Sequence, residues 1–214
     1  LCGLSVLQEA QAVRSLVLLS GGIDSTVVLA DAVIRNEEVR AITFLYGQTH
    51  AREVQAAEQI AAHYGIKHQI VELGTIFGPS ALTGTLDIPD SHADAPDATE
   101  VPGRNLVLLS TAAAIADGQG FNVVCFGANA ADAAGYPDCR PHFVEGLRDV
   151  IMAGTKNHVT LHAPLLYRSK TEVVRIGRTL NAPLHLTWSC YRGGEEPCHR
   201  CGACISRDEA ERLA

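Results

Sequence analysis

The sequence predicts an α/β fold: a doubly wound parallel sheet with a small cysteine-rich segment at its C-terminal end. Short apolar runs alternate with segments of helical period over most of the chain, a pattern typical of parallel sheets covered by helices on both faces. Hydrophobic residues make up 47% of the 214 residues but aromatic residues only 5%. The core is therefore expected to consist of Ala, Val, Leu and Ile, as in buried parallel sheets. Four of the seven cysteines lie within the last 25 residues, which sets that segment apart.

The first half of the chain supplies three predicted strands and two helices. Residues 15–20 and 39–46 are apolar runs of strand length, and residues 24–36 between them have the apolar spacing of a helix that begins at its own acidic residue. A second helix is expected at about 50–64 and a third strand at 68–73. This strand and helix order predicts that the carboxyl ends of the strands, where ligands bind in such sheets, carry the functional loops.

The second half begins with a long loop. Residues 74–103 are rich in Pro, Gly, Asp and Thr, and an irregular loop of this length in a compact domain is commonly a lid or a binding element. Further along the chain, Ser169 is the expected N-cap of the last predicted helix. The remaining predicted elements are helices at 105–118, 140–154 and 169–180 and extended segments at 121–127 and 159–165.

Charge and composition exclude several classes of protein. The net charge of −7 argues against a protein that grips nucleic acid mainly through its phosphates. No apolar run approaches the roughly 20 residues of a membrane span, and no secretory leader is expected ahead of Arg14. An odd, clustered set of cysteines suits a reducing compartment and a metal site better than a disulfide framework. The sequence therefore predicts a cytoplasmic protein.

The segment "SGGIDST", residues 20–26, follows the first predicted strand and opens the first helix. Gly21 and Gly22 let backbone N–H groups approach an anion closely, and the helix directs its positive end at the same place. Asp24 can hold Mg²⁺ or position the loop. The segment lacks the Lys-Ser or Lys-Thr of a Walker A loop, so it predicts a phosphate site that does not serve ordinary γ-phosphate transfer. The plainer alternative is a tight strand-to-helix turn.

The C-terminal segment "CYRGGEEPCHRCGAC" spaces Cys190, Cys198, Cys201 and Cys204 as a compact set of thiols. Four thiolates complete a tetrahedral Zn²⁺ site, which leaves no open position for a substrate and therefore indicates a structural role. An iron–sulfur cluster is the alternative. His199 can replace one cysteine, although a solvated state is expected for it.

Several motifs together resemble those of one family. "SGGIDST" matches the SGGxDS loop of the PP-loop ATP pyrophosphatases, and the chain from Ser15 to Arg207 resembles the 7-cyano-7-deazaguanine synthases of queuosine precursor biosynthesis. The other matching segments are "YGQTH" at 46–50, "VPGRN" at 101–105, "GYPDCR" at 135–140, Pro164, Leu165, Lys170 and the cysteine segment "SCY…CHRCGAC".

The resemblance implies a PP-loop, adenine-nucleotide hydrolase-like fold and an ATP-dependent C–N ligase that uses Mg²⁺ and Zn²⁺. Such an enzyme adenylates the carboxylate of 7-carboxy-7-deazaguanine, and ammonia then displaces AMP to give an amide. A second ATP activates the amide oxygen, and loss of AMP leaves the nitrile. A homodimer without direct nucleic-acid binding is also implied. The expected domains are 15–187, which binds ATP, and 188–214, which binds zinc.

The resemblance also implies the site residues. Arg104 can neutralise a phosphate or the substrate carboxylate, or be a surface arginine at a helix start. Lys170 is an anion contact or a solvated lysine, and Gln48 and His50 touch the substrate or cap the next helix. Cys139 is expected to be neither a ligand nor a nucleophile. The other substrate-side candidates are Asn105, Asp132, Tyr136, Asp138 and Arg140; the ATP-binding residues are Leu19, Ser20, Gly21, Gly22, Ile23, Asp24, Ser25 and Thr26.

The chain departs from the family pattern at Leu45, Thr49 and Ala134, where the family commonly has Asp, Arg and Ser. These departures keep open a related ligase that joins the deazaguanine carboxylate to another amine, such as a protein amino group. A tRNA-thiolating PP-loop enzyme and a zinc-ribbon binding module are further alternatives. Cys2 resembles the N-terminal cysteine of amidotransferases, but it is expected to belong to leader or added sequence.

Overall fold

The computed structural model describes residues 12–48, 51–84, 86–90 and 96–214. Within them, five strands form one sheet in the order β3-β2-β1-β4-β5, and every neighbouring pair is parallel. This confirms the predicted doubly wound sheet. The strands are β1 (Arg14–Leu18), β2 (Glu38–Leu45), β3 (Lys67–Glu72), β4 (Val123–Cys125) and β5 (Thr160–His162).

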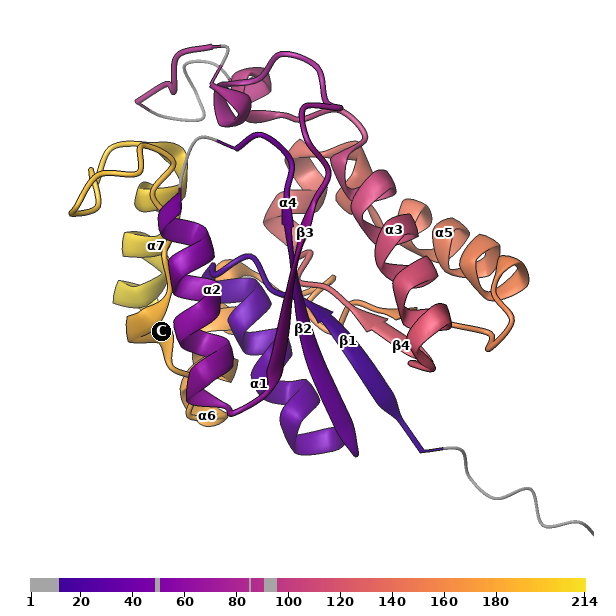
Figure 1. Ribbon diagram of the computed structural model, residues 1–214. Coiled ribbons are helices and arrows are strands. Elements are labelled where there is room, and N and C mark those ends of the chain that lie inside the picture. Colours follow the sequence, from indigo (N-terminus) through magenta and orange to yellow (C-terminus); the bar gives the residue numbers. More distant parts are fainter. Residues whose placement is uncertain (1–11, 49–50, 85, 91–95) are drawn as a thin grey trace, which may run out of the picture.

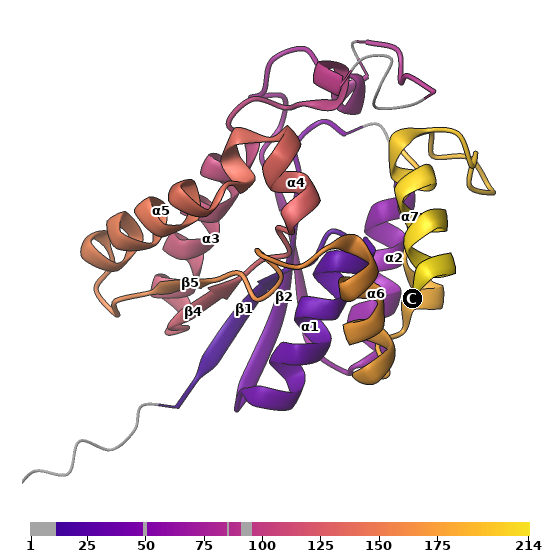
Figure 2. The same cartoon turned by 180° about the vertical axis from the view of Figure 1, so that it is seen from behind.

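Helices cover both faces of this sheet, as Figure 1 and the reverse view in Figure 2 show. Helices α3 and α5 lie on one face, and α1, α2, α6 and α7 lie on the other. The helices are α1 (Ile23–Arg35), α2 (Ala51–His63), α3 (Arg104–Gln119), α4 (Ala130–Gly135), α5 (Pro141–Gly154), α6 (Lys170–Thr179) and α7 (Gly202–Leu213).

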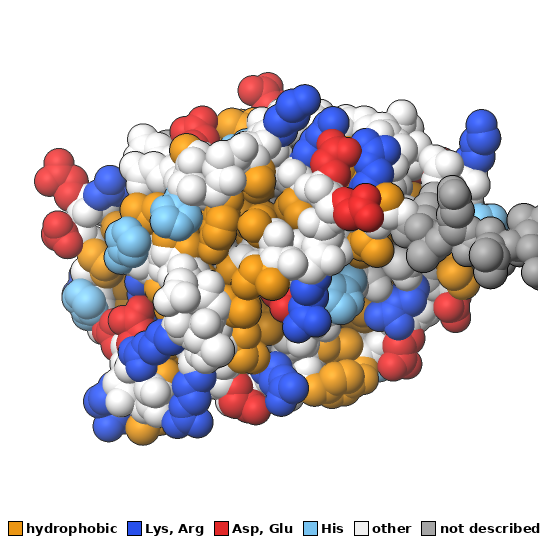
Figure 3. Space-filling model, turned by 90° about the horizontal axis from the view of Figure 1, so that it is seen from below, with side chains coloured by type: hydrophobic (Ala, Val, Ile, Leu, Met, Phe, Trp, Pro, Cys, Tyr) orange, Lys and Arg blue, Asp and Glu red, His pale blue; other side chains and the backbone are white. Residues whose placement is uncertain are grey.

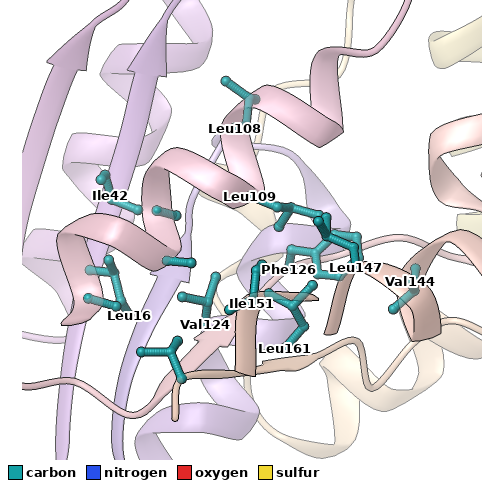
Figure 4. Packing of buried hydrophobic residues seen from close by; sticks show 14 of the residues in the cluster. Leu16, Ile42, Leu108, Leu109, Val124, Phe126, Val144, Leu147, Ile151 and Leu161 are labelled. Carbon is teal, nitrogen blue, oxygen red and sulfur yellow. The ribbon is translucent and has the colours of Figure 1, made fainter. Parts of the chain in front are cut away.

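Two apolar clusters, one on each face, form the core. On the first face, Leu16, Ile42 and Val124 of the sheet pack against α3 and α5, and Figure 4 shows them facing Leu109 and Ile151. On the second face the neighbouring sheet residues, such as Val17 and Ala41, pack against α1, α2 and α6. Adjacent strand residues point to opposite faces, so a sheet that is buried on both sides needs continuous apolar runs. The predicted aliphatic core is therefore present.

The structure adds elements that the sequence pattern did not predict. Helix α4 begins at Asn129, whose side-chain oxygen accepts hydrogen bonds from the backbone N–H groups of Ala131 and Asp132. Helix α7 begins within the cysteine segment: Cys201 is its N-cap residue and Cys204 lies in its first turn. The long loop contains two short 3₁₀ turns, Ala81–Thr83 and Pro96–Thr99. In Figure 1 it passes over the carboxyl end of the sheet.

The opposite end of the molecule, at the amino ends of the strands, has a mixed surface. Figure 3 shows a band of hydrophobic side chains there with both acidic and basic side chains around it. A cavity of about 470 Å³ opens near the starts of β1, β4 and β5. Across the described ranges, no helix is both long and apolar enough to cross a membrane.

Close packing of α6 on α1 gives a stability prediction. A Cβ at the buried Gly177 would lie 2.8 Å from Val27 Cγ2 and 3.1 Å from a methyl carbon of Leu184. We expect Gly177→Ala to lower the free energy of unfolding by about 1 kcal/mol, because overpacking costs about 1–3 kcal/mol and helix propensity returns about 1 kcal/mol. Denaturant unfolding measures this change. Gly146→Ala, on the exposed side of α5 with open space around it, is the matched control and should stabilise. Equal effects of the two substitutions would contradict the packing argument.

Candidate active site

A cavity of about 640 Å³ lies at the carboxyl ends of β1, β2 and β4. This is the edge at which ligands bind in doubly wound sheets. The cavity brings together most of the site residues predicted from the sequence. Those that line it are Leu19, Ser20, Gly22, Ile23, Asp24, Ser25, Gln48, Arg104, Asn105, Asp132, Tyr136 and Lys170.

Four predicted residues do not line the cavity, and one cannot be placed. Asp138 lies behind the wall, where its carboxylate accepts a 2.8 Å hydrogen bond from the backbone N–H of Asn105. Arg140 is exposed, whereas Gly21 and Thr26 are buried and do not line the cavity. His50 falls outside the described residues. The roles of all these residues as ligand contacts stay predictions.

Gly21 is the tightest point of the loop between β1 and α1. Its φ of +86° favours glycine, and a Cβ there would lie 2.3 Å from the carbonyl oxygen of Glu53. Its own carbonyl accepts a 2.9 Å hydrogen bond from the backbone N–H of Trp188. The loop is therefore fixed between α2 and the segment that leads into the cysteines. In this position the N-terminus of α1 presents its positive end to the cavity.

Hydroxyl groups hold the same loop from within. The Ser25 hydroxyl donates to the carbonyl oxygen of Gly22 at 3.1 Å and accepts from the backbone N–H of Ser20 at 3.2 Å. Thr26 donates its hydroxyl to the same Gly22 carbonyl at 2.8 Å. These short-range bonds close the turn, and they leave the Ser20 side chain at the cavity wall.

Asp24 is held at both carboxylate oxygens by residues from distant parts of the chain. Lys170, the first residue of α6, forms an ion pair with one oxygen, and the Asn129 side-chain amide donates to the other at 3.1 Å. The Lys170 side chain is therefore partly buried and paired rather than solvated. Asn129 is not among the site residues predicted from the sequence. Its position between the end of β4 and the start of α4 is the sequence signal that could have indicated it.

Asp132 lies in the same group of charges. Its carboxylate accepts a 3.1 Å hydrogen bond from the backbone N–H of Asn129, which completes the α4 capping box. Burial and the negative charge of Asp24 raise the pKa of Asp132, while Lys170 opposes the rise. Asp24, Lys170 and Asp132 thus form one cluster of charges beside the loop between β1 and α1, which is the predicted phosphate loop.

The far side of the cavity is built around Arg104. Its guanidinium donates a 3.1 Å hydrogen bond to the Tyr46 hydroxyl and lies 5.7 Å from the centre of that ring. Tyr46, Tyr191 and Asp138 raise the pKa of Arg104 against the opposing effect of burial, so it stays charged. The arginine opens α3 but points into the cavity wall, which differs from a surface arginine at a helix start.

Gln48 and Tyr136 complete this side. The Gln48 amide accepts from the backbone N–H of Tyr46 at 2.7 Å and donates to the Phe44 carbonyl at 2.8 Å, so it braces the end of β2. The Tyr136 hydroxyl lies 3.1 Å from the Thr99 hydroxyl, which ties the long loop to α4. Of the positions that depart from the family pattern, Ala134 lines the cavity and Leu45 does not; Thr49 lies outside the described residues.

Glu53 is a second residue that sequence reasoning missed. It lies in the first turn of α2 and lines the cavity. Burial raises its pKa to about 7, with Arg104 pulling in the opposite direction. Tyr191, also in the wall, has a raised pKa because of burial. Glu53 belongs to no matched motif, whereas Tyr191 lies within the matched segment "SCY" but was not singled out as a site residue.

The four C-terminal cysteines converge on one point, with all their sulfur atoms within 4.8 Å of one another. They are free thiols, and backbone N–H groups of Cys198 and Cys201 point to neighbouring sulfurs at 3.4 Å. Such a set of soft donors suits Zn²⁺ or an iron–sulfur cluster. His199 instead pairs with Asp208 at 2.8 Å and is largely exposed, as expected for a residue that is not a ligand.

Residues next to the cysteine cluster form part of the cavity wall. Trp188 donates its indole N–H to the Cys190 carbonyl at 2.9 Å, and Arg52 of α2 lies over the Trp188 ring at 4.9 Å. Trp188, Ser189 and Tyr191 line the cavity beside the predicted phosphate loop. A metal held by the cysteines would therefore fix one wall of the site without touching a substrate.

Comparisons with known proteins identify similar sequences and structures. Residues 14–213 match the family model described as queuosine biosynthesis protein QueC. The 7-cyano-7-deazaguanine synthase of Thermoplasma acidophilum is 40% identical over 203 residues, covering 91% of this chain and 85% of that protein. The synthase of Pseudoalteromonas atlantica is also 40% identical, covering 92% and 93%. Among solved structures, the NH3-dependent NAD synthetase from Campylobacter jejuni matches with a TM-score of 0.50 and 16% identity over 83% of this chain and 68% of its own, which supports the fold alone.

The cysteine cluster gives a prediction about metal content. We expect Cys201→Ser to lose the bound metal and to lower Tm on the order of 10 °C, because a structural metal contributes several kcal/mol to folding. Elemental analysis and thermal unfolding measure both effects, and the element found distinguishes zinc from iron. His199→Ala is the neighbouring control and should keep the metal. Equal metal content in Cys201→Ser and the unmodified protein would contradict the assignment.

Glu53 gives a prediction about pH. Its folded pKa lies above its usual value of 4.5, so the folded state binds more protons than the unfolded state between about pH 4.5 and pH 7, and stability falls as the pH rises through this window. We expect Glu53→Gln to raise Tm by a few °C at pH 8 and to leave it nearly unchanged at pH 4.5. Thermal unfolding at the two pH values checks this. Glu58→Gln, at an exposed position of the same helix, should show no such difference.

Proposed function

Because this chain belongs to the queuosine biosynthesis protein QueC family, we propose that it converts 7-carboxy-7-deazaguanine and ammonia to 7-cyano-7-deazaguanine. Two molecules of ATP are used in turn, each of which is split to AMP and pyrophosphate. The first activates the carboxylate for attack by ammonia, and the second activates the amide oxygen so that AMP leaves and the nitrile forms. The protein is therefore an ATP-dependent C–N ligase in this proposal.

The observation that carries the proposal is the pairing of the phosphate loop with Arg104 across one cavity. On one side, the loop and Lys170 supply N–H groups and a cation for the phosphates. On the other side, Arg104 supplies a fixed positive charge for the carboxylate of the deazaguanine. The cavity volume of about 640 Å³ lies in the range of small-molecule sites. The reacting carboxylate and the α-phosphate can meet between these groups.

In this proposal, aromatic and polar side chains of the cavity contact the deazaguanine ring. Tyr136 and Tyr191 line the cavity near Arg104 and Asp132, and aromatic rings of this kind stack on flat heterocycles. In this proposal Asp132 accepts a hydrogen bond from a ring N–H. Asp138 acts indirectly, because its carboxylate holds the start of α3 through Asn105.

The residues present fit both proposed metals. The Asp24 carboxylate lines the cavity beside the phosphate loop, where carboxylate and phosphate oxygens are the ligands that Mg²⁺ prefers; there the ion would neutralise the charge that develops on pyrophosphate. Cys190, Cys198, Cys201 and Cys204 would hold Zn²⁺ as a closed structural site. A cytoplasmic homodimer without direct nucleic-acid binding or a membrane is part of the proposal.

The alternative product is a stable amide formed with another amine, such as a protein amino group. It was suggested by the departures at Leu45 and Thr49, of which Leu45 does not line the cavity. A thiolating reaction would need a reactive cysteine at the site. The cysteine that lines the cavity is Cys139, and burial raises the pKa of its thiol to about 12, so it stays protonated and unreactive. The nitrile-forming reaction is therefore favoured.

Incubation of the purified protein with ATP, Mg²⁺, ammonia and 7-carboxy-7-deazaguanine tests the proposal. We expect mass spectrometry to show the nitrile, with AMP and pyrophosphate released. An amide that persists, or an adduct on an added protein, would favour the alternative ligase. Release of ADP in place of AMP would contradict the adenylation chemistry altogether.

A further inference from the structure

Three acidic residues line the cavity, and they differ in what holds them. Asp24 is bound at both oxygens by Lys170 and Asn129. Asp132 accepts a backbone hydrogen bond and belongs to the same charge cluster. Within the ranges that the structure describes, Glu53 makes no side-chain hydrogen bond and no salt bridge. It is therefore the carboxyl group of the cavity whose oxygens have no partner among the described protein groups.

The position of Glu53 is fixed by backbone packing rather than by its side chain. A Cβ built on Gly21 would lie only 2.3 Å from the Glu53 carbonyl oxygen. The first turn of α2 therefore packs directly against the predicted phosphate loop. Arg104 acts electrostatically on the Glu53 carboxyl. The other titratable groups in the same part of the cavity are Tyr46, Tyr136, Tyr191 and Asp132. Arg104 and Glu53 are thus neighbours at the end of the cavity assigned to the substrate carboxylate.

The proposed reaction has to remove protons from nitrogen at this place. When ammonia attacks the adenylated carboxylate, the new C–N bond leaves a positively charged nitrogen, which must lose one proton as the C–O bond to AMP breaks. In the second half, the amide nitrogen carries two hydrogens and the nitrile nitrogen carries none. Two further protons therefore leave that nitrogen while the second C–O bond to AMP breaks. A base must stand beside the nitrogen in both halves.

We propose that Glu53 is this base, an inference that rests on the proposed nitrile-forming function. Its carboxylate takes these protons from nitrogen one at a time, one in the first half and two in the second, and it passes each proton to water before the next transfer. Adenylation itself forms a P–O bond and releases pyrophosphate, and it needs no proton from nitrogen. The assignment therefore separates Glu53 from the residues that serve the ATP.

Asp132, in the same part of the cavity, is already engaged by the Asn129 N–H and by the charges of Asp24 and Lys170. Arg104 and Tyr191 are unsuited to the task. Arg104 stays protonated because Tyr46 raises its pKa, and burial raises the pKa of Tyr191 well above its usual range. The carboxyl of Glu53 has a pKa near 7, close to the working pH at which a general base is most effective.

Glu53→Gln tests the assignment, with Glu58→Gln on the exposed face of the same helix as the matched control. The first measurement is exchange of labelled pyrophosphate into ATP, dependent on the 7-carboxy compound, which reports adenylation alone. The second is single-turnover formation of nitrile from 7-amido-7-deazaguanine and ATP, which avoids the titration of ammonia. We expect Glu53→Gln to keep the exchange and to form nitrile on the order of 100-fold more slowly or worse. Glu58→Gln should match the unmodified protein in both.

The pH dependence supplies a readout that a structural role would not change. With the amide as substrate, nitrile formation by the unmodified protein should fall as the pH drops below about 7, because the base becomes protonated. Glu53→Gln should lose this fall in rate at low pH, the acid limb of the pH–rate profile. Glu53→Asp keeps a carboxylate, so it should be slower but retain the limb, and it serves as the second variant if the glutamine form does not fold.

Three results would overturn the assignment. Loss of exchange in step with loss of nitrile, in a folded variant, would place Glu53 in adenylation. A raised KM for the deazaguanine with an unchanged rate at saturation would make Glu53 an acceptor for the ring N–H groups. An acid limb that survives in Glu53→Gln would assign the base to another group. Absence of exchange in the unmodified protein would instead overturn the proposed function itself, and the assignment with it.

Discussion

The site depends on the close approach of α2 to Gly21. A side chain at position 21 would overlap the Glu53 carbonyl, which a Cβ would meet at 2.3 Å, and the Gly21 carbonyl in turn receives the Trp188 N–H. At this one glycine, the predicted phosphate loop contacts both the helix that carries Glu53 and the segment that leads to the cysteines. Because glycine alone permits both the positive φ and this distance, the three parts of the cavity cannot be placed independently.

This arrangement gives the cysteine cluster a role at a distance from the reaction. Trp188 donates its backbone N–H to the Gly21 carbonyl and its indole N–H to the Cys190 carbonyl. Arg52 of α2 lies over its ring. Arg52 also donates to the Gly194 carbonyl at 3.3 Å. A metal that fixes the cysteines would fix this segment as well, and through it the cavity wall formed by Tyr191. A structural metal can thus determine the shape of an active site without entering it.

The sequence predicted those parts of the site that are local in the chain. Strand period and helix period predict the sheet, and the glycine pair with its neighbouring hydroxyls lies within one turn, so its bonding follows from spacing alone. Asp24 illustrates the limit: its partners Asn129 and Lys170 are 105 and 146 residues away. Asn129 and Glu53 belong to no distinctive motif, and each lies at an ordinary helix start. Their roles arise from which loops the parallel sheet brings to one edge, and single-sequence patterns do not encode that juxtaposition.

The carboxyl groups of the cavity differ in whether they have a charged or hydrogen-bonding partner. Buried carboxylates are normally paired, because an unpaired one opposes folding once it is ionised. Asp24 and Asp132 follow this rule. Glu53 does not, although its neighbour Arg104 has a charge that could have paired with it and instead donates to the Tyr46 hydroxyl. A direct ion pair would have lowered the pKa of Glu53 and occupied both groups. In the proposed function, the absence of this pair leaves Arg104 as a cation for an anionic substrate and Glu53 as a carboxyl that can gain and lose a proton near neutral pH. Functional sites retain local conflicts with stability of this kind.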